Sequence, residues 1–207
     1  MRKPRPAPDP RPPAAFRAAH AAWQAQPVSR RRFLKGTGAL LSGLMLPWLP
    51  GDLAAEPGRN VPADPVWATL AAVQEHLFPD DGQGPGARRI RAAAYLHQAM
   101  ALPRFPPAER DFLLQGPVWL DDLARERHGV PFPVLDSDRR ESLLRDVARS
   151  EAGENWLSLV LLYLFEALLT APVYGGNPDG IGWQWLAHNP GFPLPTAANT
   201  YDRILKK

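Results

Sequence analysis

The chain has 207 residues, 45% of them hydrophobic, so it is long enough for one domain with a core and a tail. It contains no cysteine, which excludes disulfides, thiolate zinc sites, iron–sulfur clusters and covalently attached haem c from this chain. Residues 1–55 carry nine Lys/Arg and two Asp/Glu, a net of +7, whereas residues 56–207 carry a net of −4. A mildly acidic body argues against nucleic-acid binding, because nucleic-acid-binding surfaces are basic.

The first 55 residues are predicted to be a disordered extension followed by a signal peptide. Residues 1–28 are rich in Pro, Ala and Arg and lack a sustained apolar period, which predicts disorder. The stretch SRRRFLK resembles the twin-arginine export motif at every specified position, namely Ser29, Arg30, Arg31, Phe33, Leu34 and Lys35. The apolar stretch 36–49 is too short for a membrane span and is typical of a signal-peptide core. The alternative interpretation is a basic amphipathic or nuclear-type patch.

The twin-arginine route transports folded proteins, typically those that received a cofactor in the cytoplasm. The sequence has no obvious cofactor site of its own. This mismatch suggests that the signal serves a partner protein, and it predicts a periplasmic location. Residues 54–55 offer a cleavage site of small side chains.

The body, residues 56–207, is predicted to be all-α, with roughly five helices and a long irregular C-terminal tail rich in Gly, Pro and Trp. The first helix is capped by Asp64, has Pro65 at its first position and stops at Pro79. A second is expected over about 87–102. A third begins near residue 107, is kinked by Gly116-Pro117 and ends at Gly129.

Two further helices complete the predicted body. The fourth lies within residues 135–150 and is capped by Asp136 or Ser137. The fifth lies within residues 154–172 and is apolar nearly all round, although it contains Glu166. Its apolar part, residues 156–169, is short for a membrane span, so it is predicted to be the central buried helix.

The ionisable residues form no recognisable catalytic or metal motif. No histidine pair has the i, i+4 spacing of a helical zinc site, and His76 and His97 each stand alone on a helix. The pairs at 80–81 and 121–122 are interpreted as solvated charges, because neighbouring side chains on a helix point in different directions. Glu166 is the most unusual acid, since a buried carboxylate requires a partner.

The stretch TAPVYGGNPDGIGWQWLAH, residues 170–188, is not a phosphate-binding loop. Only Gly180-Ile181-Gly182 fits half of a dinucleotide motif, and it follows a helix rather than a strand. Its glycines, Asn177 and Asp179 are typical of turns with positive φ. Trp183 and Trp185 supply apolar area either to the chain's own core or to a partner, and the residues alone favour neither alternative.

The segment PVYGGNPDGIGWQWLAHNPGFPLP resembles the C-terminal signature of the gluconate 2-dehydrogenase subunit 3 family. LFPDDGQGPGARRIRAAAYLH and GVPFPVLDSDRRESLLRDV are similar to upstream segments of that family, so the resemblance covers about residues 64–195. His97 stands where an aspartate is usual, and the extension before the signal is longer than expected.

The resemblance implies a non-catalytic small (gamma) subunit with no catalytic, cofactor or metal residues of its own. The implied partners are a glucose–methanol–choline-type FAD catalytic subunit acting on sugars or polyols, a multihaem cytochrome c subunit and the twin-arginine translocase. The complex would be periplasmic and attached to the membrane through its partners. The residues predicted to contact the partner are Tyr174, Gly175, Gly176, Asn177, Asp179, Gly182, Trp183 and Trp185.

Two other hypotheses remain open. One is a stand-alone periplasmic enzyme or small-molecule-binding protein with a helical pocket near Glu166, His97 and His188. It requires three distant groups to converge. The other is a DNA-binding protein with a basic arm, against which the acidic body already weighs.

Overall fold

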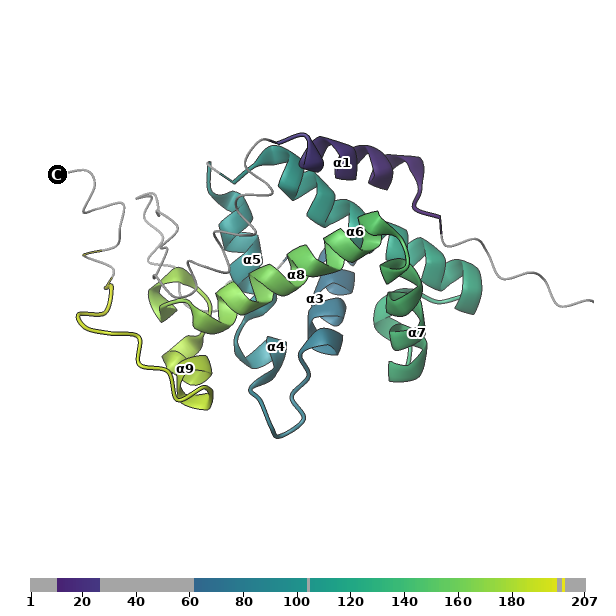
Figure 1. Cartoon of the computed structure of the whole chain (residues 1–207). Coiled ribbons are helices and arrows are strands. Elements are labelled where there is room, and N and C mark those ends of the chain that lie inside the picture. Colours follow the sequence, from purple (N-terminus) through teal and green to yellow (C-terminus); the bar gives the residue numbers. More distant parts are fainter. Residues whose placement is uncertain (1–10, 27–61, 104, 197–198, 200–207) are drawn as a thin grey trace, which may run out of the picture.

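The computed structural model describes residues 11–26, 62–103, 105–196 and 199 (Figure 1). Within these ranges the chain contains eight α-helices, three short 3₁₀ helices and no strand, which confirms the all-α prediction. The number of helices exceeds the predicted five because one predicted helix is split and because helices form near both ends of the chain. The predicted export signal, residues 29–35, lies outside the described residues, and the division at residue 55 stays a prediction.

The first predicted helix is α3 (Pro65–Leu77), which has the expected cap: the side chain of Asp64 accepts from the backbone N–H of Trp67 at 3.0 Å. The second predicted helix is two helices in the structure, α4 (Gly86–Arg89) and α5 (Ala92–Ala101). They are separated at Arg91, whose φ is 58°. The carbonyl of Ile90 leaves the helical ladder and instead accepts from the N–H of Asn177 at 3.0 Å. The break between the two helices is therefore accompanied by a hydrogen bond to Asn177, near the C-terminal end of the described residues.

Helix α6 (Pro107–His128) runs unbroken through the proline at which a kink was expected. Pro117 has no N–H, so the carbonyl of Leu113 lacks its helical donor. The indole N–H of Trp156 donates to that carbonyl at 3.1 Å. Gly116 makes room for the ring, because a Cβ there would overlap it. The donor that Pro117 removes from α6 is thus replaced by a side chain from another helix. Helix α6 ends as predicted, at Gly129 with a φ of 76°.

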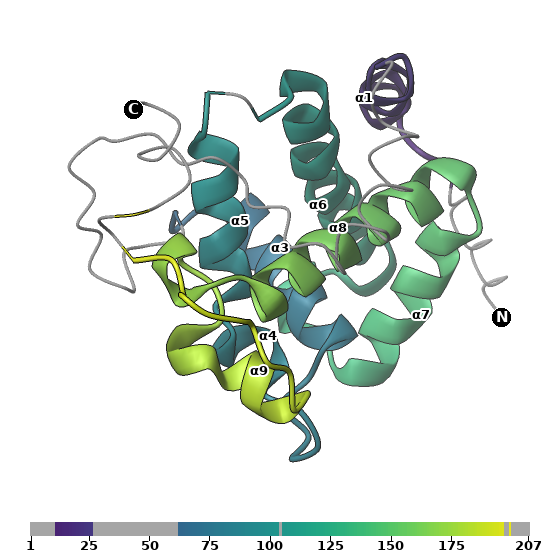
Figure 2. The same ribbon diagram turned by 60° about the vertical axis from the view of Figure 1, so that its left-hand side comes forward.

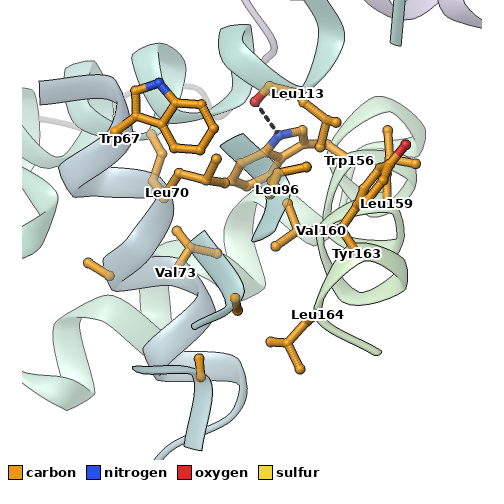
Figure 3. Packing of buried hydrophobic residues seen from close by; sticks show 14 of the residues in the cluster. Trp67, Leu70, Val73, Leu96, Leu113, Trp156, Leu159, Val160, Tyr163 and Leu164 are labelled. Atoms are coloured by element: carbon orange, nitrogen blue, oxygen red, sulfur yellow. Dashed lines mark hydrogen bonds between the residues drawn. The ribbon is translucent and has the colours of Figure 1, made fainter. Parts of the chain in front are cut away.

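Helix α8 (Glu151–Leu169) passes through the middle of the molecule (Figures 1 and 2). Figure 3 shows Trp156, Val160 and Leu164 on this helix, facing side chains of α3 and α5 that include Leu70 and Leu96. By length and composition alone the 19-residue helix could cross a membrane. Half of it is buried against its neighbours, and it contacts α3, α5, α6 and α7, as expected of a central core helix.

The remaining elements surround this core. The 3₁₀ helix η1 (Phe132–Val134) leads into α7 (Ser137–Ala148), which is capped by the side chain of Asp136 as predicted. Two 3₁₀ helices, η2 (Pro172–Tyr174) and η3 (Pro178–Gly180), and the short α9 (Ile181–Trp185) follow α8. The predicted irregular tail is therefore folded up to about residue 186.

The prediction of disorder for residues 1–28 is wrong for helix α1 (Ala14–Gln24). The alanines of this segment favour a helix, and Phe16, His20 and Trp23 form one stripe at helical spacing. That stripe packs on α6 and α8, with Phe16 fully buried. The stripe covers only two turns, and a helix this short depends on tertiary contacts that the local sequence does not reveal.

Asp121 is also not the solvated charge that was predicted. Its side chain is only 13% exposed and forms an ion pair with Arg125 at 2.9 Å. Its Oδ1 atom accepts from the backbone N–H of Phe132 at 2.9 Å and from the hydroxyl of Thr69 at 3.4 Å. Asp121 thus connects α6 to η1 and α3. Its partners on α3 and η1 lie 52 and 11 residues away along the chain. The positions of residues on one helix could therefore not predict these contacts.

Candidate functional site

The C-terminal segment, residues 170–195, folds back at one end of the molecule, where α9 lies beside the end of α8 (Figure 2). Its turns use positive φ at Gly175, Asn177, Asp179 and Gly180, as the turn chemistry predicted. This conformation produces a sharp change of direction after α8.

Asn177 holds this segment together from inside. It is fully buried, with a φ of 49°. Its Nδ2 atom donates to the carbonyl of Thr170 at 2.9 Å, and its Oδ1 atom accepts from the N–H of Gly182 at 2.7 Å. Its own backbone N–H donates to the carbonyl of Ile90. One side chain therefore joins the end of α8 to the start of α9, while its backbone anchors both to α4.

Trp183 and the glycines around it also pack within the chain. Trp183 is 9% exposed, and its indole N–H donates to the carbonyl of Leu169 at 2.8 Å. A Cβ at Gly182 would overlap the carbonyl of Leu168, and one at Gly176 would lie 2.7 Å from that of Ala167. Of the two alternatives left open for Trp183, the structure therefore places it in the chain's own core.

Gly175 and Tyr174 lie at the edge of the same packing. A Cβ at Gly175 would overlap the side chain of Gln98 on α5. Tyr174 is half-buried and packs against the core cluster. These two residues therefore contribute to the fit of the segment on α5 and α8.

Trp185 is different, because it is 45% exposed. Its ring packs against Phe78 with centroids 5.5 Å apart, and its indole N–H donates to the carbonyl of Gln83. Asp179 is exposed as well, and its backbone carbonyl accepts from the side chain of Gln184 at 2.9 Å. Of the predicted contact residues, Trp185 and Asp179 therefore keep surface available for another molecule.

Further exposed apolar side chains follow Trp185 along the chain. Leu186 is 45% exposed, Phe192 is 97% exposed and Leu194 is 40% exposed. We call Trp185, Leu186, Phe192 and Leu194 together the C-terminal apolar surface. The last three were not among the predicted contact residues, although an apolar residue in a Gly/Pro-rich segment is a usable signal. These four residues lie within ten positions of the chain, and exposed apolar side chains that gather on a surface commonly mark a site of protein contact.

The three groups of the hypothetical helical pocket each have a separate environment. Glu166 accepts from the hydroxyl of Tyr95 at 3.2 Å. Burial, and next the charge of Glu166, raise the pKa of Tyr95 well above its usual value, so that hydroxyl remains a donor. His97 packs edge-on against Trp67 at 5.0 Å, and His188 is exposed after α9. Among the described residues, no three His, Asp or Glu side chains cluster as metal ligands would.

Glu109 is a buried carboxylate that was not predicted from the sequence. It lies on α6 and is 5% exposed. Its Oε1 atom accepts from the hydroxyl of Tyr163, and its Oε2 atom accepts from the indole N–H of Trp23 at 3.4 Å. These partners are 54 and 86 residues away along the chain, so no local pattern indicates the burial.

Comparison with known proteins identifies one family. The family model described as gluconate 2-dehydrogenase subunit 3 matches residues 64–191, from the N-cap of α3 to just beyond α9. No curated protein and no solved structure shows significant similarity to the chain. The family match covers more than half of the chain and includes residues 170–191 of the C-terminal segment. The chain therefore belongs to the gluconate 2-dehydrogenase subunit 3 family, that of an accessory subunit of a dehydrogenase complex.

Proposed function

We propose that this chain is a non-catalytic small subunit that binds the FAD-containing catalytic subunit of a periplasmic sugar or polyol dehydrogenase and carries it through the twin-arginine route. The observation that carries the proposal is the family match, which extends into the C-terminal segment as far as residue 191. In this proposal the flavin belongs to the partner, which is of the glucose–methanol–choline type. A multihaem cytochrome c would be a third subunit.

The C-terminal apolar surface is the part of the chain that we propose contacts the catalytic subunit. Asn177 and Trp183 fix the part of the segment up to α9 through hydrogen bonds to Thr170, Gly182 and Leu169. Trp185, which lies on α9, therefore loses little conformational entropy on binding. Trp185 and Phe192 supply exposed aromatic area, and aromatic side chains are enriched among the residues that dominate interface energies.

The export role rests on the sequence motif at residues 29–35, which lies outside the described residues. Twin-arginine export suits a partner that binds its flavin before crossing the membrane. The small subunit would then supply the export signal for both chains. No step of the oxidation is assigned to residues of this chain.

Co-expression with a flavoprotein of the glucose–methanol–choline type from the same genome tests the proposal. The chain, tagged after Lys207, is purified from the periplasm, and the flavin absorption of the eluate is measured. We expect a larger flavin-containing chain in about equal amount. A colourless protein eluting alone would reject the accessory-subunit function and favour an independent role.

Surface variants locate the interface within that experiment. Trp185→Ala and Phe192→Ala should each weaken the complex, by about 2 kcal/mol if the residue is an interface hot spot. Val134→Ala is the matched control, because this side chain is 67% exposed on η1, away from the C-terminal segment. Equal recovery of the partner with all three variants would place the interface elsewhere.

A further inference from the structure

Helix α1 contacts the rest of the protein through one face. Phe16, His20 and Trp23 are spaced by four and three residues, so they form a single stripe toward α6 and α8. Phe16 is fully buried and His20 is 9% exposed, whereas Ala18 and Ala22 on the other face are exposed. Figure 1 shows α1 lying along α6 at the edge of the molecule. This is how an amphipathic helical ligand lies in a groove.

The apolar floor under α1 is formed by two aromatic rings of α6. The ring of Phe112 lies 5.2 Å from Phe16, 5.2 Å from His20 and 5.1 Å from Trp23, between centroids. The ring of Trp119 lies 4.8 Å from Phe16. Phe112 is 0% and Trp119 is 3% exposed with α1 in place. Departure of α1 would open both rings to solvent, and such an apolar patch normally has a partner.

Three polar contacts complete the site. Trp23 donates to Glu109 at 3.4 Å, the amide nitrogen of Asn155 lies 2.9 Å from His20 Nε2, and the amide of Gln24 donates to Glu151 at 3.0 Å. We call Glu109, Phe112, Trp119, Glu151 and Asn155 the α1 groove.

The buried carboxylate of the α1 groove, Glu109, does not depend on α1 alone for a hydrogen bond. Glu109 also accepts from the hydroxyl of Tyr163 on α8, so its carboxylate keeps a partner when α1 is absent. A carboxylate held in this way can accept from an N–H donor of another helix without first reorganising.

Helix α1 lies on the N-terminal side of the predicted export signal. It precedes the motif at residues 29–35, so a cut after that motif separates α1 from the body. We propose that α1 is a removable cover of the α1 groove, and that an amphipathic helix of the dehydrogenase catalytic subunit replaces it after the cut. This inference rests on the proposed function, because the cut belongs to export and the occupant is the proposed partner.

The contacts of α1 define the helix that fits. It carries aromatic side chains at positions i, i+4 and i+7, to meet the rings of Phe112 and Trp119. It also carries an N–H donor that reaches Glu109. In the uncut chain α1 is tethered and acts at a local concentration on the order of mM, which excludes a competing helix. The cut removes that advantage, so binding of the catalytic subunit tightens after it.

Helix α1 and helix α9, which carries Trp185, lie toward opposite ends of the molecule in both ribbon views (Figures 1 and 2). The first contact with the catalytic subunit, through the C-terminal apolar surface, therefore leaves α1 undisturbed. The second contact is added only once α1 has left. Binding in two steps of this kind makes the finished complex tighter than the exported precursor complex.

The experiment uses the full chain with a specific protease sequence placed between Lys35 and Pro62. Affinity for the purified catalytic subunit is measured before and after the cut. We expect at least about tenfold tighter binding after it, by loss of the tethered competitor. An excess of a peptide of residues 11–26 should reverse the gain. The same peptide with Phe16→Ala should fail to compete, and the peptide with Arg17→Ala, an exposed position, should compete normally.

Several outcomes would overturn the inference. Equal affinity before and after the cut, with binding in both cases, would leave the proposed function standing and reject the replacement of α1. Loss of far-ultraviolet circular dichroism in the cut body would show that α1 belongs to the fold. Binding of the catalytic subunit to neither form would reject both proposals, and entry of labelled peptide into the cut chain would then show a groove with a different occupant.

Discussion

Replacement of Asn177 by alanine should detach the C-terminal segment from the body. The change removes one acceptor and one donor, leaving the buried N–H of Gly182 and the carbonyl of Thr170 without partners. Each orphaned group costs about 1–3 kcal/mol. The positive φ of 49° adds about 1 kcal/mol, because alanine tolerates that region poorly. We expect a loss of about 3–7 kcal/mol from the free energy of opening the segment.

Two further variants separate these causes. Asn177→Gly relieves the φ penalty but loses both hydrogen bonds, so it should recover only about 1 kcal/mol. Asn177→Asp keeps the acceptor for Gly182 but turns a buried carboxylate oxygen toward the carbonyl of Thr170, so it should be at least as destabilising as alanine at neutral pH. Urea unfolding and hydrogen exchange at the Gly182 amide give the free energies. An alanine variant within about 1 kcal/mol of the unmodified protein would refute the central role of this side chain.

Three other predictions concern different parts of the chain. Gly116→Ala should destabilise the protein by about 1–3 kcal/mol through collision with Trp156, and an unchanged melting temperature would contradict the packing described here. Burial lowers the pKa of His20 below its ordinary 6.5, so α1 docking should be complete above about pH 6.5 and weaken as the pH falls through the lowered value. Hydrogen exchange of α1, corrected for intrinsic rates, should show this, and His20→Gln should abolish the dependence. Replacing Arg30 and Arg31 by lysine should leave the chain and its partner in the cytoplasm, and normal export of the partner would show that it has its own route.

The helix ends of the body were predictable because caps act locally. Asp64 and Asp136 accept from N–H groups three residues ahead, and Gly129 adopts the left-handed conformation that ends α6. Each of these signals depends on a few neighbouring residues, so the sequence contains all of the information needed. The same holds for the turn residues of the C-terminal segment.

Burial was much harder to predict, because it depends on residues far apart in the chain. Trp183 could equally have faced a partner, and only its bond to Leu169 and its low exposure place it inside. Asp121 and Glu109 resemble surface charges in sequence, yet both accept hydrogen bonds from distant helices. In each case the deciding partner is distant along the chain.

The sequence by itself determined that this protein is helical, where most of its body helices begin and end, and that its C-terminal segment resembles one family. Periodicity, caps and turn residues are local properties, and they suffice for that. The tertiary structure decided which aromatic side chains are internal, why α6 tolerates Pro117, and that α1 occupies a groove on α6 and α8. These features require surfaces from distant segments to meet, and burial of that kind is a property of the folded chain alone.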